Sequence, residues 1–168
     1  MGKIVRLTEG QLVSLVKKVL KEQDDSHYWA SCGSKRCKRD ALKLYNSCIK
    51  PNLGVIKKIE SLFGSKFEQI EVGEGVGWIG TSMDINFKKS LLVITLEPNC
   101  VMTIMGNTIP DRGDLFEIKE KEIVKILKSM NMEKYFGYHG NSLKSVELPV
   151  KEPNLISFLL KLKQFLNS

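Results

Sequence analysis

The stretch "WIGTSMDINFKKSLLVITLEPNCVMTIM", residues 78–105, decides the fold. It holds three strand-like runs, "WIGTSMDINF", "SLLVITLE" and "CVMTIM", which are connected only by "KKS" and by the turn "EPN". Pro and Asn favour tight turns, and runs of β-branched and apolar residues between turns favour strands. Three consecutive strands with such short connections predict an antiparallel meander.

Three further segments extend this sheet. "KFEQIEV", residues 66–72, alternates in strand-like fashion, and "DLFEI", residues 114–118, is a possible fourth short strand. "SVELPV", residues 145–150, is predicted to be an edge strand because Pro149 has no N–H to donate to a neighbouring strand. We therefore expect an antiparallel sheet of about four to five strands.

Helices flank these strands on both sides in the sequence. "KPNLGVIKKIESLFG", residues 50–64, has Pro51 for its first turn and Gly64 as its stop. "KEKEIVKILKSM", residues 119–130, is predicted to be a helix with Ile123, Val124, Ile126 and Leu127 inward. "EPNLISFLLKLKQFLNS", residues 152–168, is apolar over more than half its circumference. The last helix should be buried against the sheet or a partner subunit. Helices, then strands, then helices favour an α+β fold with an antiparallel sheet packed by helices and a basic helical N-terminal section.

The chain begins with a strongly marked amphipathic helix in "RLTEGQLVSLVKKVLKEQDD", residues 6–25. Thr8 and Gln11 form a capping box, and lysines cover the polar side. The apolar stripe consists of Leu12, Leu15, Val16, Val19 and Leu20. An isolated helix of this length is marginal in water, so the stripe needs a partner surface, either in its own domain or on another protein.

The positive charge is concentrated at the front of the chain. The net charge is +7, and residues 1–66 hold 14 Lys and Arg against 6 Asp and Glu, while residues 67–168 hold 12 against 13. We divide the chain into a targeting or docking helix (1–22), a basic helical section (23–65) and an α+β core (66–168). The asymmetry favours anionic partners such as nucleic acid or an acidic protein surface. No transmembrane or signal segment is indicated, so no membrane partner is expected.

Basic residues are densest in "CGSKRCKRDALKLY", residues 32–45. The candidate nucleic-acid-binding residues are Lys35, Arg36, Lys38, Arg39 and Lys43. Tyr28, Trp29 and Tyr45 would stack on bases if they are exposed. Because no sequence-reading motif is present, such contact should be independent of sequence. The alternative is a solvated basic helix face with the aromatic residues in the core.

The cysteines do not have the spacing of a metal site. His27, Cys32, Cys37 and Cys48 follow the pattern H-x4-C-x4-C-x10-C, whereas zinc sites favour close cysteine pairs. We predict no metal and no cofactor, and we expect reduced thiols, with Cys48 and Cys100 as small buried hydrophobes. A bond between Cys32 and Cys37 is conceivable in an oxidising medium.

Two segments contain residues of the kinds found in catalytic sites. "GEGVGWIG", residues 73–80, lacks the following helix and the spacing of phosphate-binding loops, so a flexible or bulged hairpin is the better interpretation. "YFGYHGNS", residues 135–142, places His139 near hydroxyl groups, which suits acid–base chemistry but is also common in surface loops. The sequence favours a binding protein over an enzyme.

The first 22 residues resemble the capsid-targeting peptides of internal head proteins of T-even-type tailed phages. Those peptides are short amphipathic helices that bind the prohead scaffold and are cut after an L-x-E tripeptide; here Leu20, Lys21 and Glu22 form "LKE", directly before Gln23. The resemblance implies a candidate processing site at Leu20, Glu22 and Gln23. It also implies other virion proteins or scaffold as partners, and location in the virion and, during infection, in the host cytoplasm.

Three functional hypotheses follow. The first is a virion-associated phage protein, directed to the capsid, whose basic section contacts nucleic acid such as DNA without reading sequence. The second is a structural or assembly component that docks through its intact N-terminal helix. The third is a small host-directed enzyme or defence inhibitor, which would lose activity in a folded His139→Ala variant.

Overall fold

The computed structural model describes residues 35–72, 79–139 and 143–168. The predicted N-terminal helix, with its stripe and its candidate processing site, lies outside these residues. In chain order the elements are α2 (Lys35–Leu44), η2 (Tyr45–Ile49), η3 (Lys50–Asn52), α3 (Leu53–Phe63), β1 (Glu71–Val72), β2 (Ile79–Asn86), β3 (Ser90–Leu96), β4 (Val101–Thr108), α4 (Leu115–Ile118), α5 (Glu120–Lys128), η4 (Glu133–Tyr135), β5 (Phe136–His139), β6 (Leu143–Pro149) and α6 (Leu155–Asn167). The chain is α+β.

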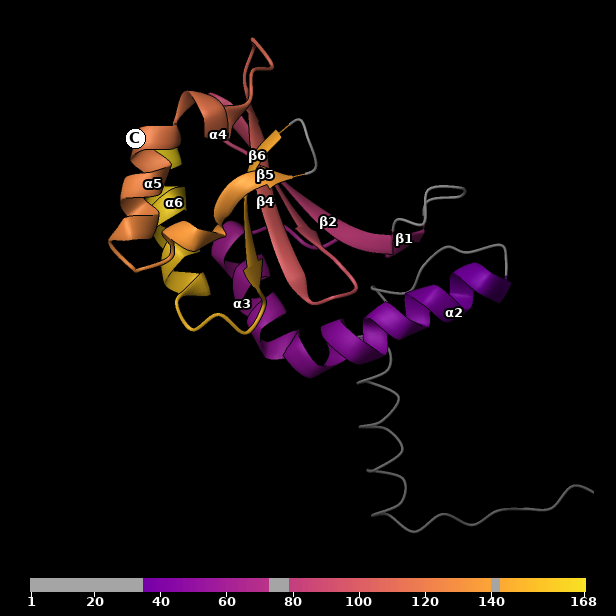
Figure 1. The fold of residues 1–168 in the computed structure, drawn as a ribbon. Helices are drawn as coiled ribbons and strands as arrows, with labels where there is room; N and C mark the ends of the chain where they lie inside the picture. The colour runs from indigo at the N-terminus through magenta and orange to yellow at the C-terminus, as the bar shows by residue number, and fades with distance from the viewer. Residues whose placement is uncertain (1–34, 73–78, 140–142) are drawn as a thin grey trace, which may run out of the picture.

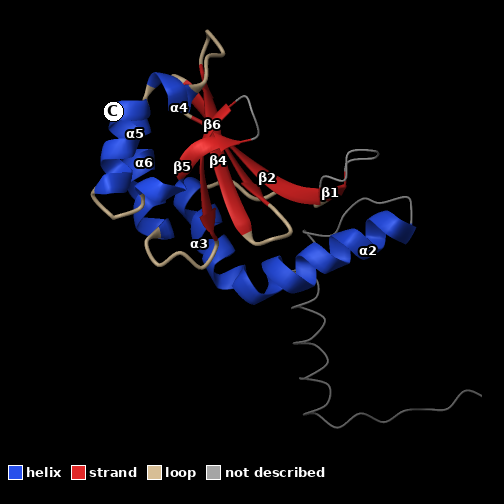
Figure 2. Cartoon of the chain, viewed as in Figure 1, coloured by secondary structure: helices blue, strands red, loops and turns tan. Residues whose placement is uncertain are grey.

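One antiparallel sheet forms the centre of the fold, with strand order β1-β2-β3-β4-β6-β5. The predicted meander is confirmed, since β2, β3 and β4 pair in sequence order. The segment predicted as a strand at residues 66–72 contributes only β1, whose two residues pair with the start of β2. Figure 2 shows α3, α5 and α6 gathered along one side of the sheet.

The prediction of a strand at residues 114–118 is wrong, because Leu115–Ile118 forms the short helix α4. Asp114 caps this helix: its Oδ1 accepts hydrogen bonds from the backbone N–H groups of Phe116 (2.9 Å) and Glu117 (3.2 Å). A carboxylate that satisfies the first N–H groups stabilises a helical turn, and this effect outweighs the strand-like alternation of five residues.

The prediction of an edge strand at residues 145–150 is also wrong, because β6 lies between β4 and β5. The proline is tolerated for a local reason. β5 pairs with β6 only from Leu143 to Val146, so Pro149, at the end of β6, has a neighbour only on the β4 side. The edge strand on this side of the sheet is β5, whose residues the sequence predicted to lie in a loop.

Alternate side chains of the strands form the core face of the sheet. Met83, Ile94 and Ile104 face one another in register on β2, β3 and β4, and all three are fully buried. The helices cover this face with Ile56, Ile59, Ile123, Leu127, Leu155, Phe158, Leu159 and Leu162, all buried. Burying a large apolar side chain contributes about 1.5–3 kcal/mol, so this contact between the layers stabilises the fold more than any exposed ion pair. The predicted burial of the C-terminal helix is confirmed, and its partner is the chain's own core.

Helix α4 packs closely against β4 because Gly106 has no side chain. A Cβ atom at this position would lie 2.6 Å from the carbonyl oxygen of Leu91 and 3.0 Å from Leu115 Cδ2. The contact with the Leu91 carbonyl oxygen is too short for real atoms and the contact with Leu115 is tight, so glycine allows β3, β4 and α4 to approach each other this closely.

Candidate nucleic-acid interface

The basic section forms one helical run from Lys35 to Phe63. Elements α2, η2, η3 and α3 follow one another without a break. Figure 1 shows them as a continuous indigo-to-purple ribbon that passes beside β1 and bends before α3. Residues 35–66 contain nine Lys or Arg and only two acids, Asp40 and Glu60.

Exposure along the first half of this run repeats every four residues. Pairs of exposed residues alternate with buried positions from residue 38 to residue 52. The exposed set consists of Lys38, Arg39, Leu42, Lys43, Asn46, Ser47, Lys50 and Pro51. We call its members from Lys38 to Lys50 the basic face. The buried set consists of Ala41, Leu44, Tyr45, Cys48, Ile49 and Asn52. From residue 38 to residue 52, one side of the run therefore packs against the rest of the domain and the other side faces outward.

The π-helical segment η2 keeps this repeat in phase. An α-helix has about 3.6 residues per turn, so a strict four-residue repeat would drift around its axis by about 40° per repeat. A π-helix bonds each residue to the fifth residue along, with about 4.4 residues per turn, and its drift has the opposite sign. Because α2 is followed by η2, the two drifts offset each other and the basic face stays on one side.

The cations of the basic face lie in solvent. Lys38, Arg39, Lys43 and Lys50 are all exposed. The guanidinium Nε of Arg39 lies 3.4 Å from Asp40 Oδ1, but the Arg39 side chain is 75% exposed, so this ion pair is worth little and leaves most of the positive field in place. Lys35 and Arg36 lie in the first turn of α2, and their side chains lie outside the described part of the chain.

The structure decides between the two roles left open for Tyr45, stacking on bases or packing in the core. This residue is only 6% exposed and packs in the core, so it cannot stack on a base. Its burial follows from the four-residue repeat, which places residue 45 on the buried side beside Leu44. Tyr28 and Trp29, the other two aromatic residues predicted to stack, lie outside the described residues.

The buried side of the helical run is also linked covalently to the sheet. Cys48 on η2 forms a disulfide with Cys100 in the turn between β3 and β4, and their Cα atoms are 5.3 Å apart. The prediction of reduced thiols at these two positions is therefore wrong. Cys48 is fully buried, as expected, whereas Cys100 is half-buried. The two residues are 52 positions apart in the chain, so only the fold reveals their proximity.

The run bends where the π-helical turn meets Pro51. Residues Lys50–Asn52 form the 3-10 turn η3, and α3 begins at Leu53, slightly later than the sequence predicted. Proline removes one backbone donor and disfavours a helical conformation at the residue before it, which accounts for a bend here. Helix α3 then ends where it was predicted to end, at Gly64, whose φ of 71° is the left-handed conformation that favours glycine.

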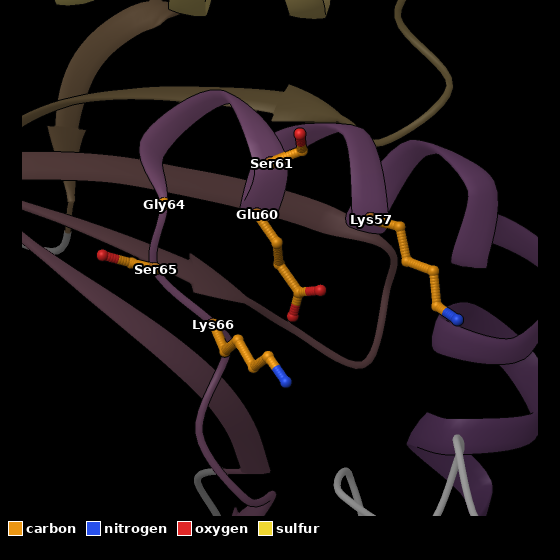
Figure 3. Close-up of a pocket in the computed structure, with 6 residues that line it drawn as sticks. All are labelled: Lys57, Glu60, Ser61, Gly64, Ser65 and Lys66. Carbon is orange, nitrogen blue, oxygen red and sulfur yellow. The ribbon is translucent and has the colours of Figure 1, made fainter.

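Beyond the bend, α3 adds exposed Lys57 and Lys58, and Lys66 follows it. A shallow hollow of about 450 Å³ lies at the end of α3, lined by Lys57, Glu60, Ser61, Gly64, Ser65 and Lys66. In Figure 3, Lys57, Glu60 and Lys66 all extend toward the lower right, with the end of Lys57 apart from the other two, while Ser61 and Ser65 point elsewhere. Ligand pockets have polar groups that converge on one point, so this hollow has the character of an extension of the basic surface rather than of a closed site.

The other candidate sites are not assembled by the described residues. The glycine-rich segment 73–78 and the side chain of His139 lie outside them, although the backbone of His139 ends strand β5. Within residues 35–72, 79–139 and 143–168, no group of three or more His, Cys, Asp or Glu side chains could hold a metal ion. No described helix has the length and apolar character that crossing a membrane requires.

A polar cluster at the edge of the sheet has a structural role. Lys144 on β6 pairs with Glu120 on α5, and its ammonium lies 5.5 Å from the centre of the Tyr138 ring. The hydrogen bond to Glu120 raises the pKa of Lys144 above its usual value, so the ammonium stays charged. The backbone N–H of Lys144 donates to Asp114 Oδ2 at 2.7 Å, which ties β6 to the cap of α4.

The fold and the site together define an α+β protein with one helical polycationic surface. Comparison of the chain with protein-family models, with curated proteins and with solved structures finds no match.

Proposed function

We propose that this protein is a virion-associated nucleic-acid-binding protein that holds the phosphate backbone through its basic face without reading sequence. The observation that carries the proposal is the exposure pattern of the helical run. Four cations lie on one outward side of a helix whose other side is anchored by core packing and a disulfide. The backbone that carries these cations is already held in a helix and loses little freedom on binding, and each cation that meets a phosphate releases a counterion.

The virion part of the proposal rests on the sequence of residues 1–22 and is supported by the disulfide. The amphipathic N-terminal stripe would address the protein to the capsid, as the resemblance to capsid-targeting peptides implies. Disulfides persist in oxidising surroundings, including the surfaces of virus particles, and are rare in the cytosol. A bond between Cys48 and Cys100 that forms after release of the particle fits this setting.

The test is binding of a short random-sequence DNA duplex, measured by fluorescence anisotropy at about 50 mM salt, where phosphate contacts are strong. The variant carries Lys38→Gln, Arg39→Gln, Lys43→Gln and Lys50→Gln. Its matched control carries Lys121→Gln, Lys125→Gln, Lys128→Gln and Lys151→Gln, which removes the same charge from exposed lysines elsewhere.

The proposal predicts that the basic-face variant loses at least about tenfold in affinity while the control loses much less, because only the first set meets phosphates directly. Equal losses in the two variants would mean that net charge alone attracts DNA. Absence of binding by the unaltered protein would remove the proposal.

A further inference from the structure

The geometry of the basic face points to a more specific ligand: we propose that this face lies in the major groove of B-form double-stranded DNA. The inference rests on the proposed function, and it names the class of nucleic acid and the manner of contact. It depends on the shape of the helical run, on the placement of its cations and on the size of the side chains between them.

The exposed residues form two lines along the helix. One line is Lys38, Leu42, Asn46 and Lys50, and the other is Arg39, Lys43 and Ser47. Neighbouring residues on a helix differ by about 100° around its axis, so the two lines point to opposite sides of the outward surface. Each line carries two cations, and a helix in a groove would direct one line to each phosphate wall.

The dimensions of the basic face match the major groove. A helix with its side chains is about 10–12 Å across, and the B-form major groove is about 12 Å wide and admits it. From Lys38 to Lys50 the rise is about 18 Å, which corresponds to about five base pairs. The groove would therefore hold the whole face without a further bend, because η3 begins only at its end.

Between Lys43 and Lys50 the basic face carries only short, uncharged side chains. Asn46 and Ser47 are short polar side chains, and both are exposed. They allow the helix backbone to come close to the groove without reading the bases. Figure 2 shows α2 extending along the margin of the fold beside β1, well away from α5 and α6.

Single-stranded nucleic acid fits the described surface less well. Binding of single strands relies on aromatic side chains that stack on successive bases, and the helical run buries its one aromatic residue in this region, Tyr45. Double-stranded RNA fits less well for a different reason. Its A-form major groove is deep and narrow, and side chains on a helix cannot enter it.

The experiment compares the full-length protein on DNA and RNA duplexes of the same length and base sequence at the same ionic strength. Both duplexes carry a dense phosphate charge, so simple electrostatic attraction gives them similar affinities. Insertion into the major groove predicts that the DNA duplex binds at least about tenfold more tightly.

A steric variant supplies the second measurement. Ser47→Trp places a large uncharged side chain in the middle of the basic face, and Gln164→Trp places the same group at an exposed position on α6 outside it. We expect Ser47→Trp to weaken DNA binding at least about tenfold and Gln164→Trp to leave it nearly unchanged, because only the first blocks the groove. If Ser47→Trp does not fold, Asn46→Trp at the adjacent exposed position gives the same test.

Equal affinity for the two duplexes, or an unaltered DNA affinity of the folded Ser47→Trp protein, would overturn the groove assignment while leaving backbone binding in place. Failure to bind either duplex at low salt would instead remove the proposed function, and the groove assignment with it.

Discussion

The side-chain Nδ2 of Asn52 donates a 2.7 Å hydrogen bond to the carbonyl oxygen of Cys48, one turn earlier in the helical run. Asn52 is only 6% exposed, and the bond spans the turn in which Pro51 offers no backbone donor. A side-chain amide thus takes part in the hydrogen bonding of the bend that separates the basic face from α3. The same residue also lies beside the disulfide, with its Nδ2 4.0 Å from Cys100 Sγ.

Replacing Asn52 by alanine should therefore destabilise the fold. A buried carbonyl oxygen that loses its donor costs about 1–3 kcal/mol, and we expect the free energy of unfolding to fall by about this amount. Urea denaturation followed by circular dichroism measures it. Because the basic face is formed by other side chains, the folded variant should keep its affinity for DNA, and an unchanged stability would show that the hydrogen bond does not matter for the bend.

The close approach of β3, β4 and α4 at Gly106 gives a second prediction. Gly106→Ala forces a Cβ atom against backbone, and overpacking of this kind costs about 1–3 kcal/mol. Gly137→Ala is the matched control, since a Cβ atom at this position of β5 meets nothing within 4 Å. Thermal unfolding should show a lower Tm for the first variant alone. Similar Tm values for both would contradict the packing described for α4.

Tyr135 and Glu152 link η4 to the segment before α6, and the link should depend on pH. The Tyr135 hydroxyl donates a 2.7 Å hydrogen bond to Glu152 Oε2, and this bond, together with burial, raises the pKa of Tyr135 above 10.0. A group whose pKa is raised in the folded state contributes stability that is fully present below its unfolded pKa and is lost as the pH rises through the folded value.

We therefore expect the contribution of this pair to disappear in alkaline solution, above the ordinary tyrosine range. Difference spectra between the unaltered protein and Tyr135→Phe isolate the titration of this hydroxyl. Glu152→Gln should lower its pKa toward the ordinary value. A Tyr135 that titrates at the same pH with and without Glu152 would contradict the hydrogen bond.

The sequence predicted the parts of the fold that local pattern controls. The meander followed from alternating runs with short turns, and the end of α3 followed from Gly64, whose backbone conformation favours glycine. The predictions are wrong where contacts between residues far apart in the sequence determine the structure. Strand β5 has four residues, one of them Gly137, and it is defined by pairing with β6 rather than by its own pattern.

The sequence predicted most of the cations of the candidate site but not how they are arranged on the helical run. Lys38, Arg39 and Lys43 were identified from their density, and all three are exposed. Lys50 was missed because it lies after the dense stretch, and only the four-residue repeat places it on the same side. That repeat was visible in the sequence, because residues 41, 44, 45, 48 and 49 follow the i, i+3, i+4, i+7, i+8 spacing of an amphipathic helix, and the same spacing places residue 50 on the exposed side.

The processing predicted for the N-terminal segment can be measured on protein taken from phage particles. Cleavage after Glu22 predicts that the measured mass is that of a chain beginning at Gln23. A particle-derived protein that begins at Met1 would instead support the alternative of a structural component that docks through its uncut helix. Absence of the protein from particles would remove both forms of the virion proposal.

The central claim is that the basic face binds the phosphate backbone. Its most direct test is the salt dependence of binding to random-sequence duplex DNA by the unaltered protein. Four cations that each neutralise a phosphate predict that log K falls with log salt with a slope of about −3 to −4, or about a hundredfold between about 50 mM and 200 mM. A slope near zero, or no binding at about 50 mM salt, would contradict the account.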